Sequence, residues 1–127
     1  MAAQEKKHIL IIEDEQNLAL GLGTLLKSQD YQVSLAYDAM FGISLAHKEN
    51  PDLIILDLGL PAGGGFFVLE NLKKSINTNK IPVLILTAKT DKESQDKSYK
   101  MGAAIFFKKP FNPQELLAAI TNLLTKK

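Results

Sequence analysis

The chain has 127 residues, of which 46% are hydrophobic and 23% are charged. These proportions are typical of a soluble globular domain, and the length suits one domain with a substantial core, so disorder, fibrous repeats and two domains are disfavoured. With 15 Lys and Arg against 14 Asp and Glu, the net charge is +1, which predicts no nucleic-acid-binding face. Cysteine is absent, which excludes disulfides, thiolate metal sites and cysteine nucleophiles. Since no signal-peptide pattern is found and no segment approaches the ~20 apolar residues of a membrane span, we expect a cytoplasmic protein without a membrane contact.

The first predicted elements follow a short polar tail at residues 1–7. A strand is predicted at 9–12, where the sequence is ILII. A helix comes next, because leucines between residues 18 and 26 recur with helical spacing. The weaker run VSLA at 33–36 fits a second strand, after which Asp38 is a candidate N-cap for a second helix.

The middle of the chain adds two purely aliphatic strands, LIIL at 53–56 and VLIL at 83–86. Short runs of this kind are typical of parallel sheets that helices cover on both faces. An apolar stripe from Phe66 to Ile76 predicts a third helix between them, and the sequence AGGG at 62–65 is expected to be a flexible turn.

A fourth helix is predicted over 90–101, with Thr90 and Glu93 forming a capping box. It contains few apolar residues, so its support is expected to be electrostatic and weak, at ~0.2 to 0.5 kcal/mol for each ion pair. We therefore expect it to be the least firmly held helix. The ion pairs expected along it are Glu93 with Lys97 and Asp96 with Lys100.

The chain ends with a weaker strand, AIFF at 104–107, and a last helix that Asn112 caps and Pro113 begins. Strand and helix therefore alternate five times. Because such crossovers are right-handed, this alternation predicts an α/β fold with a doubly wound parallel sheet.

Polar residues follow four of the five predicted strands, and ligand sites in doubly wound sheets lie beyond these strand ends. Carboxylates gathered at one edge favour a hard divalent cation such as Mg²⁺. A lysine and a threonine hydroxyl can stabilise a phosphoryl group, and an aspartate can act as its nucleophile. The residues at the strand ends are Glu13, Asp14, Asp57, Thr87, Lys108 and Lys109.

The same positions resemble the receiver domains of two-component response regulators. The resemblance lies in the acidic pair of LIIEDE, in LDLGLP, in LTA, and in KKPFNPQEL, and it spans nearly the whole chain. It implies a single receiver domain over residues 1–127, with a flavodoxin-like five-stranded parallel sheet of strand order 2-1-3-4-5 and five helices.

The resemblance also implies the roles of the acidic residues. Asp57 would be the phosphoacceptor, taking a phosphoryl group from a sensor histidine kinase or a phosphotransfer protein. Asp14, Asp57 and the backbone carbonyl of Gly59 would bind Mg²⁺, with Glu13 acting through water.

The remaining implied roles concern the response to phosphorylation. Lys109 would hold a phosphoryl oxygen, Thr87 would move to another, and Phe106 would reorient as the domain switches. The signal would leave through the fourth helix, fifth strand and fifth helix, toward a downstream protein or a fused output domain. The protein would be a switch that assists its own phosphorylation rather than an enzyme with a separate substrate, and homodimerisation on activation is left open.

Several alternatives compete with this interpretation. A pseudo-receiver would have the same fold and bind partners without phosphorylation. An aspartyl-phosphate phosphatase would need a second acidic residue where Gly59 stands, and a flavin carrier would suffer repulsion between EDEQ and the flavin phosphate. Lys108 rivals Lys109, which alone directly precedes the proline, and Phe106 also fits an ordinary core position.

Overall fold

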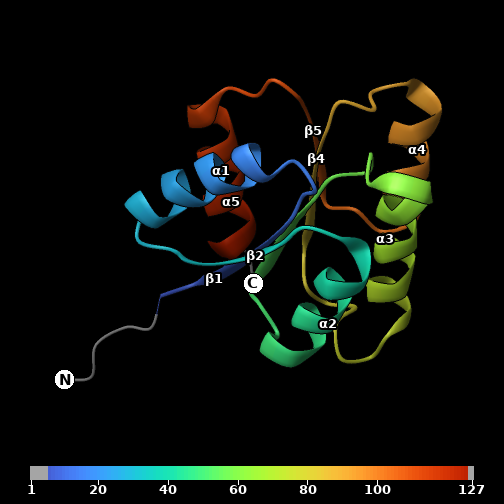
Figure 1. The fold of residues 1–127 in the computed structure, drawn as a ribbon, viewed down its shortest axis with the longest axis horizontal. Coiled ribbons are helices and arrows are strands. Elements are labelled where there is room, and N and C mark those ends of the chain that lie inside the picture. Colours follow the sequence, from blue (N-terminus) through green and yellow to red (C-terminus); the bar gives the residue numbers. More distant parts are fainter. Residues whose placement is uncertain (1–5, 126–127) are drawn as a thin grey trace.

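The computed structural model describes residues 6–125, which form a five-stranded parallel sheet with helices on both faces (Figure 1). The strand order β2-β1-β3-β4-β5 confirms the predicted topology. Of the expected polar tail, residues 1–5 lie outside the described part of the chain. Within residues 6–125, no helix combines the length and apolar character needed to cross a bilayer. In chain order the elements are β1 His8–Ile12, α1 Gln16–Ser28, β2 Gln32–Ala36, α2 Ala39–Glu49, β3 Leu53–Leu56, a 3-10 turn Pro61–Gly63, α3 Gly64–Lys74, β4 Val83–Thr87, α4 Lys92–Lys100, β5 Ile105–Lys108 and α5 Pro113–Thr125.

The register of the sheet brings the ends of its strands together. Ile12 at the end of β1 lies opposite Ala36 of β2 and Leu56 of β3. Thr87 at the end of β4 lies opposite Lys108 of β5. Because all strands run in the same direction, the residues that follow them emerge at one edge of the molecule.

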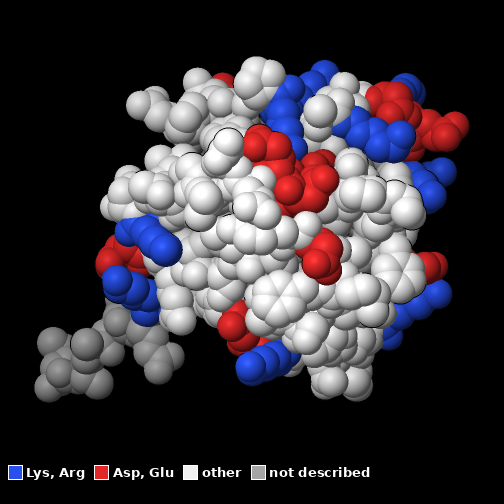
Figure 2. Space-filling view, in the orientation of Figure 1, with Lys and Arg blue, Asp and Glu red and all other residues white. Residues whose placement is uncertain are grey.

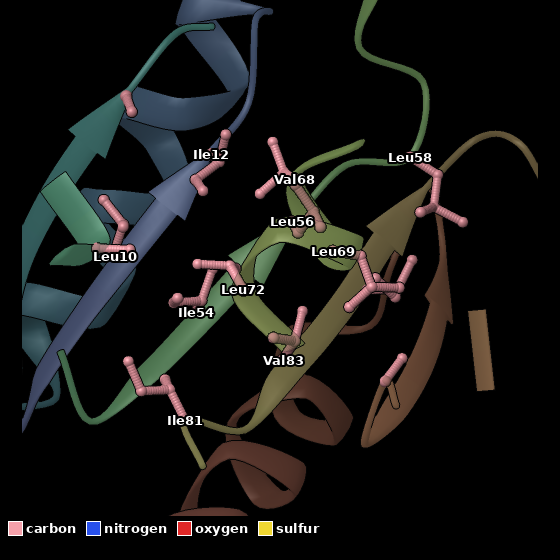
Figure 3. Packing of buried hydrophobic residues seen from close by; sticks show 14 of the residues in the cluster. Leu10, Ile12, Ile54, Leu56, Leu58, Val68, Leu69, Leu72, Ile81 and Val83 are labelled. Carbon is pink, nitrogen blue, oxygen red and sulfur yellow. The ribbon is translucent and has the colours of Figure 1, made fainter. Parts of the chain in front are cut away.

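Alternate residues of the central strands enter two separate cores. Leu10 and Ile12 of β1 pack with α2 and α3 on one face (Figure 3), whereas Ile9 and Ile11 pack with α1 and α5 on the other. All four side chains are fully buried. Since burying one such side chain stabilises a fold by ~1.5 to 3 kcal/mol, the aliphatic runs hold the sheet between its helices.

Helix caps agree with the sequence at two positions and differ at a third. The carboxylate of Asp38 accepts a hydrogen bond from the Phe41 backbone N–H at 2.8 Å, and the side chain of Asn112 caps α5. The predicted Thr90 cap is wrong, because Asp91 caps α4 by accepting from the Ser94 backbone N–H at 3.0 Å.

The glycines after β3 are not the flexible turn that was expected. Gly63 has φ 72°, but Gly64 and Gly65 belong to the first turn of α3 and are buried. A Cβ added to Gly65 would lie 2.4 Å from the Cα of Leu58. This glycine therefore permits a close approach between α3 and the end of β3. The predicted stripe of α3 also ends early, since Ile76 lies beyond the helix and is 87% exposed.

The predicted ion pairs of α4 are likewise replaced within the described residues. Lys92 lies 3.6 Å from Asp96, while Lys97 lies over the ring of Phe66 in α3, 4.3 Å from its centroid. The final strand is displaced by one residue from the expected 104–107.

Candidate functional site

Three strands deliver buried polar side chains to one edge of the sheet. Glu13 follows β1, Asp57 follows β3, and Thr87 ends β4; all three are buried. Burying polar groups is costly unless they have hydrogen-bond partners. Their partners therefore define the site.

Both carboxylate oxygens of Asp57 accept hydrogen bonds. Oδ1 accepts from the hydroxyl of Thr87 at 2.7 Å and from the backbone N–H of Gly59 at 2.8 Å. Oδ2 accepts from the ammonium group of Lys109 at 3.1 Å. Donors from three different segments thus hold this carboxylate in one orientation.

Lys109 joins the two buried carboxylates. Its Nζ lies 2.6 Å from Oε1 of Glu13 as well as 3.1 Å from Asp57. The second oxygen of Glu13 accepts from the Glu15 backbone N–H at 3.0 Å. The positive charge of Lys109 therefore offsets part of the repulsion between the two carboxylates, which lie on either side of its ammonium group.

The two carboxylates respond differently to this environment. Burial raises the pKa of Glu13 above its ordinary value, and the contact with Lys109 does not fully oppose that effect. Burial would also raise the pKa of Asp57, but hydrogen bonds from Thr87 and Gly59 together with the charge of Lys109 outweigh it and lower that pKa. The lowered pKa favours the ionised form of Asp57, which is the form that a nucleophile requires.

The acidic residues also match the requirements of a divalent cation. Glu13, Asp14 and Asp57 each offer a carboxylate oxygen, and these oxygens lie within 4.8 Å of one another. Figure 2 shows acidic side chains gathered on the upper part of the face, where β1 leads into α1 in Figure 1, with basic side chains beside them. An all-oxygen ligand set with an exposed member, Asp14, suits Mg²⁺, which retains water molecules when bound.

The structure brings most of the candidate residues together and separates two of them. Lys108, the rival of Lys109, is exposed, and of these two lysines Lys109 is the one that contacts the carboxylates of Glu13 and Asp57. Phe106 of β5 is half-buried and packs against the core shared with α2 and α3.

Two contributors could not be found from residue types. The backbone N–H of Gly59 binds Asp57, and the backbone N–H of Lys89 donates to the Thr87 hydroxyl at 3.1 Å. Every residue except proline has such a donor, so only the path of the chain shows where it points.

Comparison with known proteins finds similar sequences among response regulators and similar structures among receiver domains. The response regulator ArlR of Staphylococcus aureus is 39% identical over 93% of this chain and 52% of its own length. The non-phosphorylated receiver domain of HemR from Leptospira biflexa is 31% identical, with a TM-score of 0.87 over 96% of this chain and 97% of that domain. The receiver domain of the sensor histidine kinase PA1611 from Pseudomonas aeruginosa PAO1 was solved with magnesium in its active-site cleft. It is 23% identical to this chain, with a TM-score of 0.87 over 96% of this chain and all of that one, which shows a shared fold.

The chain spans about half the length of the curated relatives it matches. The family model for the response regulator receiver domain matches residues 9–121, which include every element from β1 through most of α5. The chain therefore belongs to the family of response regulator receiver domains, whose general role is that of a phosphorylation switch.

Proposed function

We propose that this chain is a single Mg²⁺-dependent receiver domain in which Asp57 accepts a phosphoryl group. The supporting observation is the arrangement around Asp57, whose carboxylate is buried, held by Thr87, Gly59 and Lys109, and adjacent to two further acidic side chains. Family membership makes a phosphorylation switch the expected role, and the lowered pKa of Asp57 favours the ionised nucleophile.

In the proposed reaction a carboxylate oxygen of Asp57 attacks the phosphorus of a phosphohistidine on a partner kinase or phosphotransfer protein. An O–P bond forms as the N–P bond breaks, and the imidazole nitrogen leaves with the electron pair. Bound Mg²⁺, held by Asp14, Asp57 and the carbonyl of Gly59 with Glu13 acting through water, would offset charge on the phosphoryl oxygens.

The other residues of the site orient the transferred group. Lys109 already contacts Oδ2 of Asp57 and can donate an ammonium hydrogen to a phosphoryl oxygen. The Thr87 hydroxyl, which donates to Asp57 in the structure, can rotate and donate to a second phosphoryl oxygen instead. Thr87 has a single hydroxyl hydrogen, so its contact with a phosphoryl oxygen requires the loss of its contact with Asp57. Lys109 has three ammonium hydrogens, and its contacts with Glu13 and Asp57 leave one for a phosphoryl oxygen.

We assign the output to the face formed by α4, β5 and α5, with Phe106 of β5 responding to Thr87. The partner at this face would be a downstream protein or a fused output domain, and we expect both the protein and its partner to be in the cytoplasm. The protein would turn over no separate substrate.

The proposal can be tested by intact mass after incubation with Mg²⁺ and acetyl phosphate. One added phosphoryl group is expected on the native protein and none on Asp57→Asn, and removing Mg²⁺ should abolish the addition. A folded protein that binds Mg²⁺ but gains no mass, even with candidate kinases, would instead be a pseudo-receiver that binds partners without phosphorylation.

A further inference from the structure

Few side chains of α4 are buried against the rest of the described fold. Of its nine residues, only Ser94 and Ser98 are buried, and the Ser98 hydroxyl donates to the Gln95 carbonyl within the helix. Its one large apolar side chain, Tyr99, is 45% exposed. Because small side chains remove little apolar surface from water, the position of α4 depends strongly on its remaining contacts.

Lys97 provides one of these contacts, and it reaches α3. Its Nζ lies 4.3 Å from the centroid of the Phe66 ring, within the range of a cation–π interaction. Phe66 itself is half-buried against the core on this face of the sheet. Figure 1 shows α3 and α4 side by side, so this pair joins two neighbouring helices.

Phe66 directly follows the glycine that touches the phosphoacceptor segment. A Cβ on Gly65 would lie 2.4 Å from the Cα of Leu58 and 2.6 Å from the backbone oxygen of Asp57. No room therefore separates the first turn of α3 from the peptide that carries the acceptor. A displacement of that peptide toward α3 must displace Gly65, and with it the backbone of Phe66.

The geometry points to a latch, formed by Phe66 and Lys97, through which the phosphorylation state of Asp57 changes the stability of α4. The inference rests on the proposed function of Asp57 and adds a route through α3 to the one through Thr87 and Phe106. Phosphorylation adds charge and strong hydrogen-bond acceptors beside the Asp57 peptide. Phe66 acts as a positioning residue, because it contacts α4 and not the reacting atoms.

Hydrogen exchange of residues 92–100 tests the latch in the native protein, Phe66→Leu, Lys97→Met and the double variant. Leucine keeps apolar bulk at the core, and methionine keeps the length of lysine without its charge. Each single substitution should raise the hydrogen-exchange rate of α4 about two- to fivefold, which corresponds to the free energy of an exposed cation–π contact. The exchange rate of the double variant should be no higher than that of either single variant.

Two matched variants control for general effects. Phe67→Leu alters a neighbouring ring in α3 that is 49% exposed, and Lys92→Met removes a charge from α4 whose side chain is 90% exposed. Phe67→Leu combined with Lys97→Met, and Phe66→Leu combined with Lys92→Met, should each change α4 exchange by the product of the two single effects.

The same samples are then compared before and after treatment with acetyl phosphate and Mg²⁺, with the phosphorylated fraction measured by intact mass. Phosphorylation should change α4 exchange in the native protein, and this change should be smaller in both latch variants. Independent, multiplicative effects of the two substitutions, or an undiminished response to phosphorylation, would overturn the latch alone. A native protein that gains no phosphoryl group would overturn the proposed function, and the role of the latch with it.

Discussion

At the scale of single residues, Lys109 supplies the positive charge that offsets the two buried carboxylates of the site. Its ammonium group lies between Glu13 and Asp57, and these two contacts raise its own pKa despite partial burial, which acts in the opposite direction. Lys109 therefore occupies carboxylate oxygens that a cation would also use. If the proposed function holds, Lys109 would compete with Mg²⁺ in the free protein and would assist phosphoryl transfer once a phosphoryl oxygen is present.

Replacing Lys109 with Met should separate these two effects. Mg²⁺ should bind more tightly by about fivefold or more, because a unit charge near the carboxylates no longer repels it. Phosphorylation by acetyl phosphate should slow by ~10²-fold or more, as expected when a stabilising donor is lost. Calorimetric titration and time-resolved intact mass measure the two quantities, with the exposed neighbour Lys108→Met as control. Weaker Mg²⁺ binding in Lys109→Met would contradict the competition.

The lowered pKa of Asp57 predicts a particular pH dependence of stability. A carboxylate whose pKa is lower in the folded state contributes stability that is present above its unfolded pKa and is lost as pH falls through the folded pKa. Glu13, whose folded pKa is raised, contributes in the opposite sense, with stability lost as pH rises through that folded pKa.

Asp57→Asn removes the first effect, and it also removes one cause of the raised pKa of Glu13, the charge of Asp57. The difference in free energy of unfolding between the native protein and Asp57→Asn should be constant near neutral pH and should shift against the native protein below about pH 4. Urea denaturation at a series of pH values measures it. A difference that does not change between neutral and acidic pH would show that folding leaves the Asp57 pKa where it was.

At the scale of elements, Gly65 sets how closely α3 approaches the segment that carries Asp57. Gly65→Ala would place a methyl group 2.4 Å from a backbone atom, so α3 or β3 must shift, which typically costs ~1 to 3 kcal/mol. Gly21→Ala in α1 is the matched control, because its added methyl group meets no atom within 4 Å and should stabilise the helix by up to ~1 kcal/mol. Chemical denaturation should therefore give opposite signs for the two changes. Equal and small effects would mean that the contact at Gly65 is readily relaxed.

Helices, strands and turns differ in how accurately their residue types predict them. The strand at 53–56 was predicted with its observed bounds, because four aliphatic residues between polar neighbours have few alternatives. The cap of α4 was misplaced at Thr90, because the adjacent Asp91 is also a residue type that caps helices and only backbone geometry selects one of the two. The glycines at 63–65 were interpreted as conformational freedom, although two of them serve close packing.

At the scale of the whole molecule, the doubly wound parallel sheet and the meeting of its strand ends were predictable because parallel crossovers allow few arrangements. The strand order 2-1-3-4-5, which the structure confirms, was implied by the resemblance to a family. This topology brings Glu13, Asp57 and Lys109 together from distant parts of the chain. The choice of Lys109 over Lys108 required the resemblance to a family, because spacing alone does not orient a side chain. The backbone donors of Gly59 and Lys89 depend on the path of the loops and had no signal in the sequence.

A cation shared by residues after β1 and β3 would also tie together two central strands, so Mg²⁺ should stabilise the whole molecule. A ligand that binds only the folded state at tenfold its Kd contributes about 1.4 kcal/mol to the free energy of unfolding. Asp14→Asn provides the sharpest comparison, because this exposed side chain belongs to the acidic cluster without being part of the buried pairs with Lys109. Thermal unfolding with and without Mg²⁺, at constant ionic strength, should show stabilisation of the native protein and a much smaller effect in Asp14→Asn. Equal stabilisation of both would place the cation elsewhere, because a site built on Asp14 cannot bind equally well after its carboxylate is lost.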